Sequence, residues 1–196
     1  MEPASGTFIT IDGPNGVGKT CVVSLVCNEL ERLGWNVLQT KEPTASFNRT
    51  NEEKHGHALA GLIVEDRRQH LLNEIEPALV NGISVICDRY IESSLVYRGL
   101  DGISFEDTWQ ENKYFRIPDM SILLTCPAGV LEGRLKRKVS LSRFEREHTS
   151  EEELLLYDKA RQFLKVYGFK SAIIENDGDS VADVAKQIVC LIRQLL

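Results

Sequence analysis

The sequence predicts an α/β fold in which a five-stranded parallel sheet carries helices on both faces. Short runs rich in β-branched residues alternate along the chain with longer stretches whose apolar residues recur at helical spacing. Such alternation implies right-handed crossovers between parallel strands. The strand-like runs are continuously apolar, as expected of strands buried on both faces. Because no repeat, low-complexity tract or linker interrupts the pattern, residues 1–196 are predicted to form a single domain.

The elements are expected in strict alternation, and the ends of the early strands are polar. The strands are placed at Thr7–Ile11, Asn36–Gln39, Ile83–Cys87, Met120–Cys126 and Ser171–Ile174. The helical stretches are placed at Thr20–Leu33, Glu53–Val80, Glu92–Tyr97 with Glu106–Tyr114, Gly129–Lys138, Glu151–Val166 and Ser180–Leu195. Ligands of open parallel sheets bind outside the carboxyl ends of the strands. The first three strands end in a glycine-rich loop, in Lys41-Glu42-Pro43 and in Asp88-Arg89-Tyr90, so a site is predicted at that edge.

Residues 13–20, Gly-Pro-Asn-Gly-Val-Gly-Lys-Thr, form a complete G-x-x-x-x-G-K-[ST] motif between a predicted strand and a predicted helix. The glycines let successive backbone N–H groups point into one concavity, and the helix N-terminus adds positive charge there. Lys19 is expected to reach the β- and γ-phosphates, which makes it a catalytic candidate. The motif predicts a P-loop NTPase three-layer fold and an ATP site made of Gly13, Asn15, Gly16, Val17, Gly18, Lys19 and Thr20.

A magnesium site is predicted beside this loop. Asp88 ends the apolar strand that begins at Ile83, and a hard cation such as Mg²⁺ prefers carboxylate, hydroxyl and water oxygens. Asp88 and the Thr20 hydroxyl are therefore the candidate ligands of Mg²⁺. The adjacent Arg89 is a candidate for phosphate recognition, with an ordinary salt bridge to Asp88 or a contact with a helix end as the alternative.

A basic segment stands out in an otherwise acidic chain. It contains Arg134, Lys136, Arg137, Lys138, Arg143 and Arg146. A solvated helix face is one interpretation, and a mobile lid that closes over a transferred phosphoryl group is the other. The phosphate loop contains no arginine, which favours a short basic lid at about residues 137–148. Arg143, Arg137 and Arg146 are its candidate catalytic residues.

The composition argues against several classes of protein. The net charge of −6 disfavours general nucleic-acid binding, which needs a basic surface. No apolar stretch approaches membrane-spanning length, and residues 1–6 lack the features of a signal peptide. The five cysteines include no C-x-x-C pair and predict reduced thiols. A cytoplasmic protein without a nucleic-acid or membrane partner is therefore expected.

Several short blocks together resemble the thymidylate kinase family of nucleoside monophosphate kinases. Beyond the phosphate loop they are Thr40–Pro43, Asp66–His70, Glu76–Leu79, Asp88–Tyr97, Pro118–Met120 and Arg143–Glu145, in the order of the family. The resemblance implies ATP-dependent, Mg²⁺-requiring conversion of a deoxynucleoside monophosphate to its diphosphate, most simply dTMP to dTDP, by a homodimer.

The resemblance also implies an acceptor site. It assigns Arg89 to the acceptor phosphate, Arg67 to the edge of the base and Tyr97 to the neighbourhood of C2′, where it disfavours ribose. It assigns the lid arginines to the transferred phosphate. The complete predicted acceptor-binding set is Glu42, Ile63, Arg67, Arg89, Ser94 and Tyr97.

Departures from the family pattern keep alternatives open. Asn15 stands where the family has an acidic residue, and Ile63 where it often has phenylalanine. Other departures are Thr44–Phe47, Arg98 and Ser142. They motivate a second hypothesis, a kinase for another or a modified pyrimidine nucleotide. A regulatory P-loop switch is a further alternative, but its N-K-x-D and D-x-x-G motifs are missing, and a polynucleotide kinase is disfavoured by the acidic charge.

Overall fold

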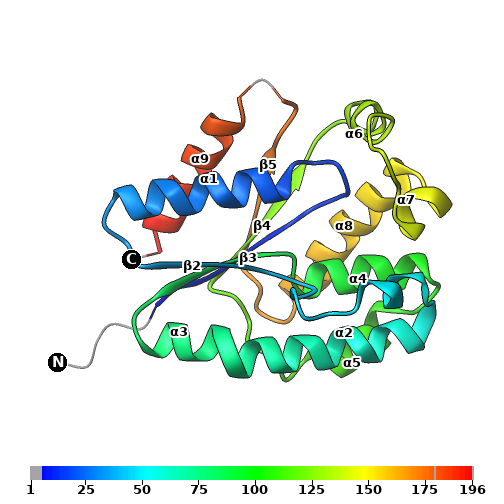
Figure 1. The fold of residues 1–196 in the computed structure, drawn as a ribbon, viewed down its shortest axis with the longest axis horizontal. Coiled ribbons are helices and arrows are strands. Elements are labelled where there is room, and N and C mark those ends of the chain that lie inside the picture. The colour runs from blue at the N-terminus through cyan, green and yellow to red at the C-terminus, as the bar shows by residue number, and fades with distance from the viewer. Residues whose placement is uncertain (1–5, 179, 196) are drawn as a thin grey trace.

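The computed structural model describes residues 6–178 and 180–195, so the N-terminal segment 1–5, on which the signal-peptide prediction rests, lies outside it. Within these residues, five strands form one all-parallel sheet in the order β2-β3-β1-β4-β5 (Figure 1). The strands are β1 (Phe8–Asp12), β2 (Val37–Lys41), β3 (Ser84–Asp88), β4 (Met120–Thr125) and β5 (Ser171–Glu175). Each lies where the apolar runs predicted a strand, so the predicted five-stranded parallel sheet is confirmed.

The predicted helical stretches are also present. The helices are α1 (Lys19–Arg32), α2 (Gly56–His70), α3 (Glu76–Val80), α4 (Ile91–Leu100), α5 (Phe105–Asn112), α6 (Ala128–Leu135), α7 (Arg143–Glu147), α8 (Ser150–Lys165) and α9 (Val181–Arg193). A π-helical turn, η2 (Leu71–Ile75), joins α2 to α3, and a 3₁₀ turn, η1 (Arg49–Glu53), precedes α2. The short helix α7 and η1 were not predicted. A capping box between Ser142 and Glu145 begins α7 and was its readable sequence signal.

Helices cover both faces of the sheet, which gives the predicted three layers (Figure 1). On one face α1 and α9 pack on alternate strand residues such as Ile9 and Ile122. On the other face α3, α4 and α8 pack on the intervening positions such as Phe8 and Leu123. This alternation explains the continuous apolar runs, because successive side chains of a strand point to opposite faces. Among the described residues, no helix combines the length and apolar character needed to cross a membrane.

Two carboxylates are buried near the start of α4, one at the end of β1 and one on α4 itself. Asp12, at the end of β1, accepts hydrogen bonds from the backbone N–H groups of Tyr90 and Ser93 at 3.2 and 3.1 Å. Neither carboxylate oxygen of Glu92, on α4, has a hydrogen-bond partner in the described part of the chain. Burial raises the pKa of both groups, and burial together with the charge of Asp12 raises that of Glu92 to about 8. Glu92 is therefore a neutral acid in the folded protein at neutral pH.

We predict that Glu92 makes the protein less stable as the pH rises. Between pH 5 and 8 the folded state keeps a proton that the unfolded chain has released, so the free energy of unfolding falls over this range. Glu92→Gln removes the titration, and the variant should gain about 3 to 4 kcal/mol relative to wild type between pH 5 and pH 8. Denaturant unfolding at both pH values measures this difference. Parallel pH profiles for the two proteins would contradict it.

Candidate active site

The phosphate loop connects the end of β1 to the first turn of α1. Gly13 has φ +147°, and a Cβ there would lie 2.4 Å from the carbonyl oxygen of Leu124. Gly18 has φ +95°, and a Cβ there would lie 2.9 Å from the side-chain nitrogen of Asn176. Both positions therefore require glycine for conformation and for space. The loop has the strand-to-helix setting that its motif predicts.

Lys19 is folded back into this loop. It is only 6% exposed, and its Nζ donates to the carbonyl oxygens of Gly13 and Pro14 at 2.7 and 2.8 Å. Burial, followed by the nearby charge of Arg89, lowers the pKa of Lys19 to about 7. The ammonium thus lies at the mouth of the loop with no carboxylate within hydrogen-bond distance in the described part of the chain.

The two predicted magnesium ligands lie next to each other. The Thr20 hydroxyl donates to Asp88 Oδ2 at 2.7 Å, because Thr20 begins α1 and Asp88 ends the adjacent strand β3. Asp88 Oδ1 is buried and has no hydrogen-bond partner among the described residues. No cluster of three or more acidic, histidine or cysteine side chains suited to a metal occurs within residues 6–178 and 180–195. This donor set fits Mg²⁺, which usually keeps waters and phosphate oxygens alongside one or two protein ligands.

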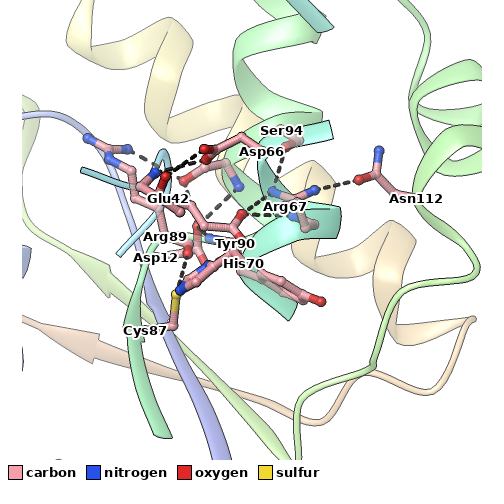
Figure 2. A network of polar contacts seen from close by, with 12 residues as sticks. Asp12, Glu42, Asp66, Arg67, His70, Cys87, Arg89, Tyr90, Ser94 and Asn112 are labelled. Atoms are coloured by element: carbon pink, nitrogen blue, oxygen red, sulfur yellow. Dashed lines mark hydrogen bonds and ion pairs between the residues drawn. The ribbon is translucent and has the colours of Figure 1, made fainter. Parts of the chain in front are cut away.

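Arg89 lies between the phosphate loop and α4. Its guanidinium donates to Asn15 Oδ1 at 2.8 Å and to the Tyr97 hydroxyl at 2.8 Å (Figure 2 shows Arg89 beside Asp12). Its backbone has φ +76°, a strained conformation for a residue with a side chain. Within the described part of the chain, Arg89 forms no ion pair with Asp88, so that part of the predicted alternative is not found.

Glu153 completes this network and was not predicted. Its Oε1 accepts from the backbone N–H of Asn15 at 3.0 Å and from the Tyr97 hydroxyl at 2.7 Å. It belongs to three consecutive glutamates in the first turn of α8, where acidic residues are favoured by the helix dipole alone. Nothing in the sequence therefore distinguished Glu153 from its neighbours.

Arg67 is the centre of a second polar network (Figure 2). The side chain is 1% exposed and donates from Nε to Glu42 at 2.7 Å and from Nη2 to Ser94 at 3.0 Å. It also donates from Nη1 to Asn112, and its guanidinium lies over the ring of Tyr90, 4.7 Å from the centroid. Burial alone would lower the pKa of Arg67, but the charges of Glu42, Tyr90 and Asp12 and the hydrogen bond to Glu42 together outweigh it and raise the pKa. The predicted base-reading arginine is therefore charged and held rigidly, and Asn112 is a partner that the sequence did not reveal.

A cavity of about 320 Å³ lies between the phosphate loop and helices α2 and α4. Asn15, Thr20 and Asp88 line it at the phosphate-loop side. The whole predicted acceptor set lines the same cavity: Glu42, Ile63, Arg67, Arg89, Ser94 and Tyr97. Residues of the phosphate loop, the ends of β2 and β3, and helices α2 and α4 thus meet around one space of the size of a small-molecule site.

The arginines of the basic segment differ in what they contact. Arg134 donates to the carbonyl oxygens of Gly16 and Val17, both at 3.3 Å, and so supports the phosphate loop from α6. Arg137 lies exposed in the connection between α6 and α7. Of the two arginines on α7, Arg146 pairs with Glu53 at 2.9 Å while Arg143 is buried against Asp101.

The chain is similar in sequence to known proteins over most of its length. The sequence model of the family described as "Thymidylate kinase" matches residues 11–188. A protein called "Probable thymidylate kinase" from Pyrococcus abyssi is 36% identical over 206 residues, covering 97% of this chain and 98% of the relative. Proteins called "Thymidylate kinase" from Desulfotalea psychrophila and Halalkalibacterium halodurans are 30% and 31% identical, with 98% of each relative covered.

Proposed function

This chain belongs to the thymidylate kinase family, and from that premise we propose that it transfers the γ-phosphoryl group of ATP to dTMP and releases dTDP and ADP. The observation that carries this proposal is the single cavity shared by the phosphate loop and the six predicted acceptor residues. A kinase must hold donor and acceptor phosphates in line, and one continuous space between the two sets of groups allows that arrangement.

The donor half of the reaction is proposed to rest on the phosphate loop. Backbone N–H groups of residues 16–20 cradle the β-phosphate, and Lys19 exchanges its two carbonyl partners for phosphate oxygens. Thr20 and Asp88 would hold Mg²⁺, which neutralises charge on the β- and γ-phosphates when bound. Phosphoryl transfer gains most from such positioned positive charge.

The acceptor half is proposed to rest on α2 and α4. Arg89 binds the acceptor phosphate, because its two terminal nitrogens reach the cavity beside the loop. Arg67 and Ser94 face the base, Glu42 keeps Arg67 charged, Ile63 packs against the base, and Tyr97 borders the sugar. One of the lid arginines, Arg137, Arg143 or Arg146, is proposed to contact the transferred phosphoryl group. Arg143 is already paired with buried Asp101, so Arg137 and Arg146 are the better candidates.

Three further properties are part of the proposal. The family resemblance supports a homodimer. The net charge of −6 supports a protein without a nucleic-acid partner. We further propose that it works in the cytoplasm without a membrane partner, because its cysteines include no C-x-x-C pair and its sequence has no apolar run of spanning length.

We predict that dTMP is the preferred acceptor in a panel of nucleoside monophosphates assayed with ATP and Mg²⁺. The panel contains dTMP, dUMP, dCMP, UMP, CMP and dGMP, and the measured quantity is kcat/KM for each. The value for dTMP should exceed that for the purine nucleotide by at least ~100-fold, since a site built to hydrogen-bond one base edge leaves polar groups unpaired with another. Slow turnover of dTMP beside fast turnover of another nucleotide would contradict the prediction.

A second candidate function is a kinase for another or a modified pyrimidine nucleotide. Two cavity positions favour it. Ile63 presents a branched aliphatic surface where the family often has an aromatic ring, and Asn15 presents a neutral amide to Arg89. An aliphatic wall stacks less well on a flat base but tolerates a substituent on it. The same panel, extended to 5-substituted deoxycytidylates, distinguishes the two functions.

A further inference from the structure

Asp101, at the C-terminal end of α4, lies where three segments around the cavity meet. Its Oδ1 accepts from Arg143 Nη1 at 2.7 Å, and its Oδ2 accepts from Arg143 Nη2 at 3.0 Å and from the backbone N–H of Gly56 at 2.9 Å. The side chains of Asp101 and Arg143 are 6% and 2% exposed. Solvent therefore screens this pair weakly, and removing either side chain takes the shortest ion-pair contact from a charge that stays buried.

On the acceptor side, Asp101 caps the N-terminus of α2, although the two lie 45 residues apart in the sequence. Gly56 is the first residue of α2, and the preceding His55 makes no side-chain capping hydrogen bond. The carboxylate of Asp101 thus supplies the anionic partner that a helix N-terminus favours. Burial would raise the pKa of Asp101, but the hydrogen bonds from Arg143 and Gly56 outweigh it and lower the pKa. In this way Asp101 ties the start of α2 to the end of α4, the two helices that carry Arg67 and Tyr97.

On the lid side, Arg143 is wholly engaged by protein groups. Besides Asp101, its Nη1 contacts His55 Nδ1 at 3.0 Å and Glu147 at 3.2 Å. Its guanidinium lies 4.0 Å from the ring centroid of Phe144, and that ring packs 4.7 Å from the ring of Tyr97. Because Asp101, Arg143 and Phe144 all line the cavity, the pair fixes α7 directly over it.

We propose that Asp101 and Arg143 are positioning residues that latch the lid segment, residues 137–148, over the acceptor cavity and so set the affinity for the acceptor nucleotide. The inference rests on the proposed function, in which this cavity takes the acceptor. In this proposal Arg143 holds Phe144 and α7 in position over the cavity. A different cation contacts the transferred phosphoryl group.

Steady-state kinetics of Asp101→Asn, Arg143→Gln and the double variant test the latch. Each single change should raise the acceptor KM at least ~10-fold with a smaller effect on kcat, since both break a buried charge pair. The double variant should be no worse than the poorer single variant, because the two residues share one interaction. Arg143→Lys keeps the charge and should recover part of the affinity. Glu147→Gln is the matched control, because it removes an exposed partner of the same guanidinium and should change KM less than ~2-fold.

Limited proteolysis tests the same latch without turnover. Lys136, Arg137 and Lys138 are exposed trypsin sites directly before α7. Cleavage there should be at least ~5-fold faster in Asp101→Asn than in wild type, and unchanged in Glu147→Gln, since local opening governs the rate. If the wild type phosphorylates no nucleotide, the proposed function fails, while the cleavage rates still decide whether the latch exists.

Two results would overturn the latch. One is a loss of kcat near 10³-fold in Arg143→Gln with an unchanged acceptor KM and no coupling to Asp101→Asn, the pattern of a group that touches the reacting phosphate. The other is equal cleavage of wild type and Asp101→Asn. Circular dichroism and thermal unfolding of each variant establish that it is folded, and Arg143→Lys carries the test if Asp101→Asn is not.

Discussion

Lys19→Ala should lower kcat at least ~10³-fold while the protein stays folded. The ammonium is buried in the phosphate loop, and its hydrogen-bond partners among the described residues are two backbone carbonyls, which it can exchange for phosphate oxygens. Removing it takes away the one loop cation that reaches the transferring phosphate, and neighbouring water cannot replace a positioned charge in a buried site. Measurement of kcat at saturating ATP and dTMP checks the loss.

The control for this variant is Lys186→Ala. Lys186 is exposed on α9 and pairs with the exposed Asp183 at 3.0 Å, so its loss should leave kcat within ~2-fold of wild type. Turnover of Lys19→Ala close to that of wild type would mean that Lys19 has a structural task in the loop and none in transfer.

Arg89→Ala should raise the acceptor KM about 100-fold and the ATP KM less than ~5-fold, because it removes a charge-assisted, two-pronged contact with one phosphate. The guanidinium is oriented by Asn15 and Tyr97 and faces the cavity from the acceptor side of the loop. Separate titrations of ATP and dTMP measure the two constants. Arg89→Lys should lie between the two proteins, since it keeps the charge and loses the fork.

The opposite ranking of the two KM values would contradict the assignment. A larger rise for ATP would place Arg89 on the donor phosphates. It would also move the acceptor phosphate to another cation around the cavity.

The sequence predicted the sheet and the phosphate loop well because both are encoded locally. Continuous apolar runs that alternate with helical stretches, and a loop fixed by glycine positions, leave little choice of structure. The Asp88-Arg89 pair was predictable for the same reason, since the end of a central strand fixes where both residues lie. These features depend on residues that are neighbours in the chain.

Asn112, Asp101 and Glu153 escaped prediction because each acts through a neighbour that is distant in the sequence. Asn112 meets Arg67 across 45 residues, and Asp101 meets Arg143 across 42. On their own helices they are ordinary polar residues at or near a helix end. Only the packing of α2, α4, α5, α7, α8 and the phosphate loop against one another gives these three residues their partners.

The ion pair of Arg143 with Asp101 could not be predicted from the sequence either. The pattern correctly marked residues 134–146 as unusual but could not divide six basic side chains among loop support, surface and latch. Which carboxylate pairs with a given arginine depends on the tertiary structure, which brings together residues far apart in the sequence.

The hydrogen bond from Asn15 to Glu153 joins positions 138 residues apart and has a consequence for how the protein matures. The phosphate loop lies within the first twenty residues of the chain, yet the backbone N–H of Asn15 has its acceptor on α8. Contacts of such long range close late in folding, because loop-closure entropy must be overcome first. Nucleotide binding should therefore be among the last properties regained during refolding. A nascent chain carries the complete motif long before it has a working loop.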